Sequence, residues 1–106
     1  MYVRMTFFRL KPGKMVDLRE LYNKEVLPTH KGHKGIRFVH LLESLDEKDE
    51  GISVTAWDTK ADVEAYERSG DYEKLVAKFK EMYAEEPRLK SYEVTASSEP
   101  ILLRIF

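Results

Sequence analysis

The sequence contains no cysteine among its 106 residues. Disulfide frameworks, thiolate nucleophiles and cysteine-ligated zinc or iron–sulfur centres are therefore excluded. It also lacks an apolar run of roughly 18 residues, which a membrane-spanning helix needs, and its first residues alternate polar and apolar types, unlike a signal peptide. We therefore expect no membrane span and a location in a reducing cytoplasm.

The chain has no marked excess of either charge, since 18 Lys and Arg stand against 19 Asp and Glu, for a formal net charge of -1. Long-range attraction to nucleic acid is therefore not expected. The residues that are present, 42% hydrophobic and 35% charged, are typical of a globular protein with a charged surface. We expect one domain over residues 1–106, with a core at 2–96 and an apolar tail at 101–106.

Hydrophobic periodicity predicts the order β-α-β-β-α-β. Pro28 is expected to end the first helix, because proline disfavours a helical residue before it. This order is that of a ferredoxin-like α+β fold, a four-stranded antiparallel sheet with two helices on one face. The strands are expected at residues 2–10, 36–44, 52–57 and 89–96, and the helices at 15–26 and, with a break at Ser69-Gly70, at 60–83.

Both faces of the predicted sheet carry large apolar side chains. Along the first strand, for example, Val3, Met5 and Phe7 alternate with Phe8 and Leu10. Two helices can cover only one face, and a bare apolar sheet face is rarely left in water. We therefore expect a homodimer, in which a second copy covers the other face. The tail 101–106, with five apolar residues of six, is expected to run along the partner.

Trp57, the single tryptophan, stands where the third strand turns into the second helix. Asp58 and Thr59 behind it are both good helix N-caps, and a pocket is expected at this corner. A large ring at such a corner is more often part of the core than of a site. Tyr66 and Tyr72 also face the sheet by their spacing, and their hydroxyls need protein partners or a ligand.

Three histidines fall close together, His30 and His33 in a basic loop at residues 29–35 and His40 on the second strand. A metal or proton-relay site is one interpretation, and a solvated loop with one packed histidine is the other. The second is favoured because no carboxylate stands at ligand spacing, so no metal site is expected. His40 shares its strand face with Ile36, Phe38 and Leu42, and is expected to be a neutral imidazole in an apolar setting.

Five short segments within residues 2–96 form a recognisable set: Gly35-Ile36, Thr55-Ala56-Trp57, residues 61–69, Ser69-Gly70-Asp71-Tyr72 and Tyr92-Glu93-Val94. Together they resemble the antibiotic biosynthesis monooxygenase-like family of the dimeric α/β-barrel superfamily. The resemblance implies a homodimer whose two sheets face each other as a barrel, with a pocket between sheet and helices in each subunit.

Members of this family that degrade haem carry an asparagine on strand one, the strand-three tryptophan and an iron-ligating histidine on helix two. Only Trp57 is matched here, because Thr6 and Val76 stand at the other two positions. We therefore expect no histidine-ligated haem and no other cofactor. In quinone-forming members an asparagine four residues before the tryptophan holds a phenolic substrate, and here that place is Ser53, whose hydroxyl can still bond a substrate oxygen.

The resemblance implies a small monooxygenase acting on an aromatic or polyketide-like molecule without metal or flavin. Such chemistry requires a substrate that forms a stabilised carbanion or phenolate, so the protein would deprotonate and position it. A non-catalytic small-molecule-binding dimer and an isomerase or lyase remain alternatives. His40 is the candidate base and Trp57 the candidate catalytic wall; the candidate substrate-binding residues are Arg4, Thr6, Phe8, Ser53, Tyr66 and Tyr72.

Overall fold

The computed structural model describes residues 1–98, so the tail at 101–106 and its expected contact with a partner lie outside the described residues. The strands are β1 (Tyr2–Arg9), β2 (Ile36–Glu43), β3 (Glu50–Trp57) and β4 (Arg88–Glu93). The helical elements are α1 (Met15–Leu21), a π-helical turn (Tyr22–Val26), α2 (Leu27–Lys31), α3 (Lys60–Ser69), α4 (Asp71–Phe79) and a 3-10 turn (Lys80–Met82). None of these helices is long and apolar enough to cross a membrane.

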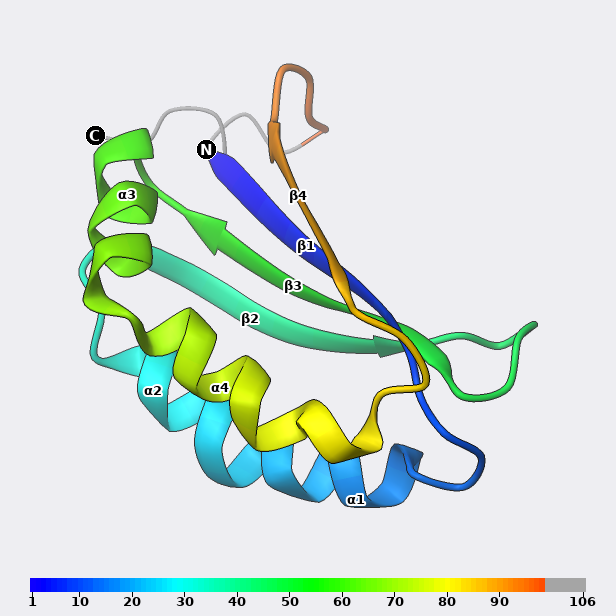
Figure 1. Cartoon of the computed structure of the whole chain (residues 1–106). Coiled ribbons are helices and arrows are strands. Elements are labelled where there is room, and N and C mark those ends of the chain that lie inside the picture. Colours follow the sequence, from blue (N-terminus) through cyan, green and yellow to red (C-terminus); the bar gives the residue numbers. More distant parts are fainter. Residues whose placement is uncertain (99–106) are drawn as a thin grey trace.

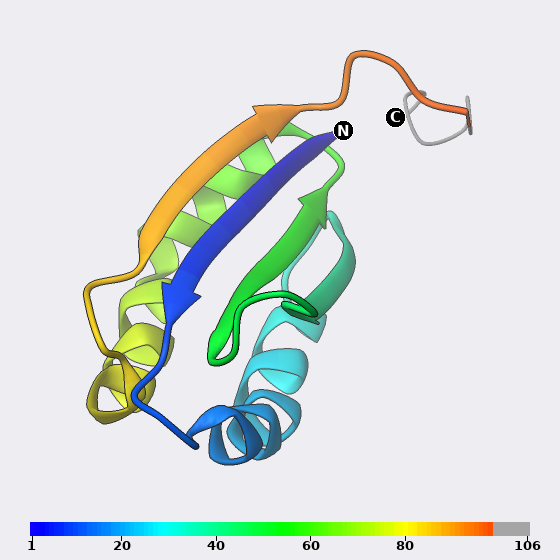
Figure 2. The same ribbon diagram turned by 90° about the vertical axis from the view of Figure 1, so that its right-hand side faces the viewer.

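The four strands form one antiparallel sheet in the order β2-β3-β1-β4. All helices lie on one side of this sheet (Figure 1), which confirms the ferredoxin-like fold predicted from periodicity. A second view shows β1 and β3 in the middle of the sheet (Figure 2). Because side chains alternate along a strand, each strand sends one set to the helix side and the other to the opposite, open face.

The core on the helix side forms because apolar side chains four residues apart lie on one side of a helix. Apolar side chains of α1 and of the π-helical turn after it pack against α4 and against the end of β1. The buried members of this cluster are Phe8, Leu10, Leu18, Tyr22, Val26, Leu75 and Phe79. The helical members of this cluster all lie within the helices predicted at residues 15–26 and 60–83.

The prediction that Pro28 ends the first helix is wrong. The segment widens into the π-helical turn, where the Leu27 N–H bonds the Tyr22 carbonyl five residues back. Pro28 then stands in the first turn of α2, where a missing N–H removes little. His30 therefore belongs to a helix and not to the basic loop that was predicted at residues 29–35.

Two glycines shape the surroundings of the site. A Cβ at position 51 would lie 2.6 Å from Phe8 Cζ and 2.5 Å from the Leu42 carbonyl oxygen, so glycine is needed for Phe8 to pack across β3. Gly70, with φ of +80°, separates α3 from α4 in a left-handed conformation that glycine adopts at little cost. The predicted break at Ser69-Gly70 is thus confirmed.

The open face of the sheet is apolar, and no helix of residues 1–98 covers it (Figure 1). The second sheet that we expect there stays a prediction. A β-bulge between Ile36 and Phe38 shifts the register of β2, so Ile36 packs against Trp57 on the helix side. Strict alternation had predicted that Ile36 shares a face with His40. Because of the bulge, it does not. The cluster on the open face contains Val3, Val54 and Ala56, with Met5, Phe38 and Ile52 packed against them.

Candidate functional site

A cavity lies between the helix side of the sheet and the helices. The space that the centre of a water molecule can reach within it is about 60 Å³, several times the roughly 10–15 Å³ that one water needs. It can therefore hold a few waters or one small planar ligand. The structure brings the six residues predicted to bind substrate together around it: Arg4, Thr6, Phe8, Ser53, Tyr66 and Tyr72. That they bind a substrate stays a prediction.

Arg4 is a buried cation at the wall of this cavity. Its side chain is 4% exposed, and Nη1 lies 2.9 Å from Oε2 of Glu67, whose side chain is 49% exposed. That pair is not aligned as a hydrogen bond, and neither Nη1 nor Nη2 donates one to any described residue. The guanidinium carbon lies 5.5 Å from the ring centroid of Tyr66 and 5.1 Å from that of Tyr72. Two aromatic faces and the Glu67 carboxylate therefore hold the charge, while Nη1 and Nη2 donate no hydrogen bond to the described residues.

His30 is the second polar group of note in the cavity wall. Its side chain is buried, and Nδ1 lies 2.9 Å from the Val26 carbonyl oxygen. A carbonyl can only accept, so Nδ1 carries the proton and donates. Burial lowers the pKa of His30. The nearby His33 and Arg4 also lower this pKa, while the hydrogen bond to the Val26 carbonyl and the charge of Asp71 raise it. The imidazole is therefore neutral near neutral pH, with its lone pair on Nε2.

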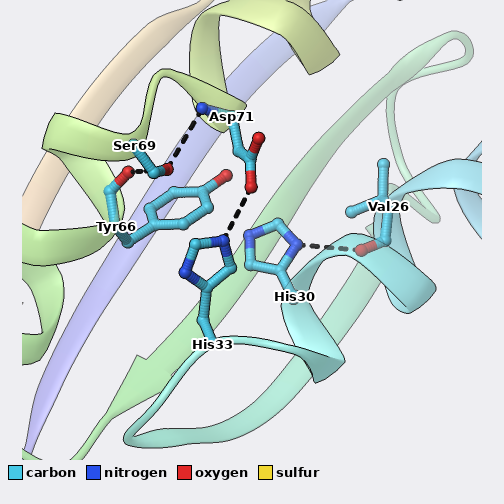
Figure 3. A network of polar contacts seen from close by, with 6 residues as sticks. All are labelled: Val26, His30, His33, Tyr66, Ser69 and Asp71. Atoms are coloured by element: carbon cyan, nitrogen blue, oxygen red, sulfur yellow. Dashed lines mark hydrogen bonds and ion pairs between the residues drawn. The ribbon is translucent and has the colours of Figure 1, made fainter.

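A polar network holds the aromatic wall of the cavity in place (Figure 3). His33 Nε2 lies 2.7 Å from Asp71 Oδ2, which ties the loop after α2 to the start of α4. The Ser69 hydroxyl donates to the Tyr66 carbonyl and accepts from the Asp71 N–H. The rings of His30 and His33 pack on the Tyr66 ring at centroid distances of 4.8 and 4.9 Å. Tyr66 is thus fixed from two sides.

The hydroxyl groups of Tyr22 and Ser53 form a hydrogen bond with each other at another part of the cavity wall. The Tyr22 hydroxyl lies 3.1 Å from the His40 carbonyl oxygen and 2.8 Å from Ser53 Oγ. The arrangement that satisfies both contacts has Tyr22 donating to the carbonyl and accepting from Ser53. Burial raises the pKa of Tyr22 to about 12, although the Ser53 bond opposes it. Ser53 therefore keeps only lone pairs for a ligand and would accept a hydrogen bond from it.

Trp57 is not among the residues that line this cavity, although the sequence had predicted it as a wall. It is fully buried, and its Nε1 donates to Thr55 Oγ1 at 2.9 Å. Thr55 does line the cavity. Because the Thr55 oxygen accepts from the indole, its own proton remains for a ligand. Trp57 therefore acts as a core residue that orients Thr55.

His40 lies on the open face of the sheet and not in the cavity. It is exposed, and its ring stacks on Phe38 at a centroid distance of 4.5 Å. Alternation along β2 turns Val39 and Leu41 to the helix side instead. His40 therefore cannot serve this cavity as a base within one chain, and the histidine available there is His30.

The family model described as "Antibiotic biosynthesis monooxygenase" matches residues 1–97 of the chain. The chain belongs to this family. The resemblance seen in the sequence is thereby confirmed, and the family supports a monooxygenase-like function in coarse terms. Among curated proteins, none matches the chain.

Several solved structures share the fold of this chain along nearly its whole length. A candidate antibiotic biosynthesis monooxygenase from Nitrosomonas europaea has a TM-score of 0.75 at 19% identity, covering 91% of this chain and 100% of that chain. A protein from Mycobacterium tuberculosis has a TM-score of 0.74 at 18% identity, covering 92% and 98%. A candidate monooxygenase of the same name from Deinococcus radiodurans reaches 0.78 at 12% identity, covering 93% and 97%. At such identities the likeness shows the fold alone.

Haem, which some members of the antibiotic biosynthesis monooxygenase family degrade, does not fit the residues present. Val76 stands at the expected ligand position and lines the cavity. The space of about 60 Å³ is also far too small for the macrocycle. In the described part of the chain, no group of three or more His, Asp or Glu could hold a metal ion.

Four polar residues that line the cavity were not predicted as site residues from the sequence: Tyr22, His30, Thr55 and Tyr83. Tyr22 lay within the helix predicted at residues 15–26 but was not proposed for the site. His30 was placed in a loop because Pro28 was expected to end the helix. Residues 22, 26 and 30 are spaced by four, which was a signal that the helical face continues. Thr55 lies two residues after Ser53 and so shares its strand face.

Acidification is expected to destabilise the protein through His30. The ordinary pKa of 6.5 is lowered in the fold, so below about pH 6.5 the unfolded chain binds more protons than the folded one. The free energy of unfolding should therefore fall as the pH drops through and below this value. Urea unfolding between about pH 7.5 and pH 5 measures it.

The matched variants for this pH dependence are His30→Asn, which keeps a donor for the Val26 carbonyl, and His40→Asn on the exposed face. We expect His30→Asn to flatten the decline and His40→Asn to preserve it. Arg4, His33 and Asp71 face His30 and are unchanged in both. An equal slope in His30→Asn and the unaltered protein would place the responsible proton elsewhere.

Proposed function

We propose that this protein is a monooxygenase in which the substrate itself reduces dioxygen, and that His30 is the base that activates it. The observation that carries the proposal is the buried His30 imidazole, whose Nδ1–H is engaged by Val26. This leaves Nε2 as a base on the side of the ring turned away from Val26 and towards Tyr66 (Figure 3). A histidine held neutral at working pH is suited to general-base catalysis.

The proposed reaction converts a phenol into a quinone. His30 Nε2 takes the phenolic proton, and the electron-rich phenolate reacts with dioxygen at an unsubstituted ring carbon. One oxygen atom becomes the new carbonyl and the other leaves as water with the two hydrogens lost from substrate C–H and O–H. The sum, phenol plus O₂ giving quinone plus water, balances with no further reductant. The apolar wall of the cavity excludes bulk water from the phenolate.

The size of the cavity favours a single-ring substrate over a polycyclic polyketide. The space that the centre of a water molecule can reach within it is about 60 Å³, and the rings of Phe8, Phe79 and Tyr83 are among its walls. Flat walls of this kind suit one aromatic ring, which can pack edge-on or offset against them. We therefore propose monocyclic phenols as the substrate class.

We also propose that the working form is a homodimer built on the open face of the sheet. The apolar side chains of β1, β2 and β3 gather there, and no helix in the described part of the chain lies over them (Figure 2). Val3, Val54 and Ala56 are already buried in the single chain, so a second sheet facing the first would remove from water the more exposed apolar side chains of this face, such as Leu42. The cavity lies on the other side of the sheet, so each subunit would keep its own.

Dioxygen uptake tests the proposed function. With monocyclic phenols and hydroquinones, we expect the protein to consume oxygen faster than the uncatalysed reaction, with quinone formed in equal amount. His30→Asn should lower the rate at least about 100-fold, the usual contribution of a general base. His40→Asn should keep the rate. An unchanged rate in His30→Asn would reject the base assignment, and no uptake above background would reject the monooxygenase.

A proton-transfer enzyme is the second candidate, and the pairing of a neutral base with the Arg4 cation in one cavity favours it. Such a pair can remove a proton and stabilise the resulting enolate without dioxygen. Anaerobic incubation in heavy water separates the two candidates. Exchange of a substrate C–H for deuterium, without oxygen uptake under air, would favour the isomerase or lyase.

A further inference from the structure

We propose that Arg4 is the anchor for an anionic group on the ligand, so that the cavity selects an aromatic carboxylate that carries a phenolic hydroxyl. This inference deepens the proposed function and rests on it only for calling the ligand a substrate. The anion site itself stands on the surroundings of Arg4.

The guanidinium of Arg4 is only partly neutralised and hydrogen-bonded by the protein. Glu67 lies 2.9 Å from Nη1, but its side chain is 49% exposed, so water competes for it. Neither Nη1 nor Nη2 donates a hydrogen bond within residues 1–98, although the side chain is 4% exposed. Buried donors are rarely left unpaired, because they lose their bonds to water without replacement. A ligand atom that accepts from both would complete them.

The cavity itself supplies no anion to Arg4. Among its lining residues in the described part of the chain there is no Asp or Glu, and Arg4 and His30 are the only basic ones. His30 is neutral near neutral pH because burial lowers its pKa. The cavity thus has one positive charge in an apolar, aromatic lining, and the only ion-pair partner of that charge within residues 1–98, Glu67, is half exposed and lies outside the lining. This arrangement favours a carboxylate over a neutral amide or alcohol.

The strand register places a donor beside Arg4 and an acceptor further along. Thr55 is the cross-strand partner of Arg4, and Ser53 is that of Thr6, so both pairs point to the helix side. Thr55 has a hydroxyl proton to give, since its oxygen accepts from Trp57. Ser53 has only lone pairs to offer, since its proton goes to Tyr22.

The two pairs match the two ends of one ligand. Residues two apart on a strand are separated by roughly 7 Å, comparable to the distance between the carboxylate and the hydroxyl of 4-hydroxybenzoate. The carboxylate would accept from Arg4 and Thr55, and the phenol would donate to Ser53 in the bound ligand. In the proposed reaction the proton of that hydroxyl would then pass to His30, which lines the same cavity. The aromatic rings of Tyr66 and Tyr72 would flank the ring between them.

Calorimetric titration with 4-hydroxybenzoate and its neutral isostere 4-hydroxybenzamide tests this site. The folded protein should bind the carboxylate at least about ten-fold tighter, the effect of one charged hydrogen-bonded contact. Arg4→Met, which keeps an apolar stem, should remove the preference. Equal affinities, or no binding of 4-hydroxybenzoate by the folded protein at millimolar concentration, would overturn the proposal.

Glu67→Gln is the matched control, because it removes the ion pair of Arg4 without touching the cavity. If Arg4 serves only as the partner of Glu67, both variants should behave alike; if Arg4 binds the anion, Glu67→Gln should keep or strengthen the preference. If Arg4→Met fails to fold, the Glu67→Gln variant and the comparison of 4-hydroxybenzoate with 4-hydroxybenzamide still test whether Arg4 binds the anion. Neither measurement needs dioxygen, so carboxylate preference without oxygen uptake would reject the proposed function alone. Oxygen uptake on neutral phenols without that preference would reject the anion site alone.

Discussion

Replacing Trp57 with alanine is expected to lower the free energy of unfolding by roughly 3–5 kcal/mol, the usual cost of removing a fully buried large ring. The indole is completely enclosed, packs on Tyr66 at a centroid distance of 5.0 Å and contacts Val63 in the same cluster. Its loss would leave a hole where β3 meets α3. Urea unfolding at constant m-value measures the change. For a domain of this size such a loss is a large share of the total stability.

Two milder variants separate the packing of Trp57 from its hydrogen bond. Trp57→Phe keeps a ring but loses the bond to Thr55, and should cost about 1–3 kcal/mol. Thr55→Val removes the acceptor and keeps the indole. Since Trp57 orients Thr55 at the cavity wall, both variants should weaken ligand binding. A Trp57→Phe protein that binds every ligand as before would make Trp57 a core residue without influence on the cavity.

The strand faces could be predicted because a period of two depends only on local spacing. Arg4, Thr6 and Phe8 were expected on one face, and they line the cavity together. Ser53 follows from the same rule once β1 and β3 are paired in register. A sheet residue of this kind is placed by alternation alone.

The histidine at the cavity could not be predicted by the same rule. His30 reaches the wall only because the π-helical turn carries the helix past Pro28, and a π-helical turn has no reliable sequence signature. His40 was assigned to the site from its apolar face partners, but β2 turns that face away from the helices. Periodicity shows which residues share a face and not which face the helices cover.

Trp57 illustrates a third limit of the sequence. Its position at the end of β3 was predicted, and the Thr59 hydroxyl behind it accepts from the Asp62 N–H as an N-cap. Whether the ring lines the cavity or lies in the core depends on how His30, His33 and Tyr66 pack around it. These contacts join segments far apart in the chain, so local patterns do not contain them.

Leu42→Asp is expected to convert the dimer that we propose into a monomer. Leu42 is 46% exposed on the open face in the single chain, so the substitution costs the isolated subunit little, yet it would bury a charge between two facing sheets. The dissociation constant should rise at least about 30-fold, the effect of losing one interface hot spot of about 2 kcal/mol. Sedimentation equilibrium at micromolar concentration measures it.

Val16→Asp is the control for the dimer interface, because Val16 is an equally apolar side chain, 54% exposed, on α1 and away from the open face. It should leave the dimer intact, and equal dissociation in both variants would place the interface elsewhere. A folded, soluble monomer of the unaltered protein at these concentrations would refute the dimer itself.

A chain ending at Ser98 tests the contribution of the apolar tail to the dimer. We expect this truncated chain to form a weaker dimer than the full-length chain. An unchanged dissociation constant would reject the tail contact alone, because the Leu42→Asp variant tests the sheet interface independently.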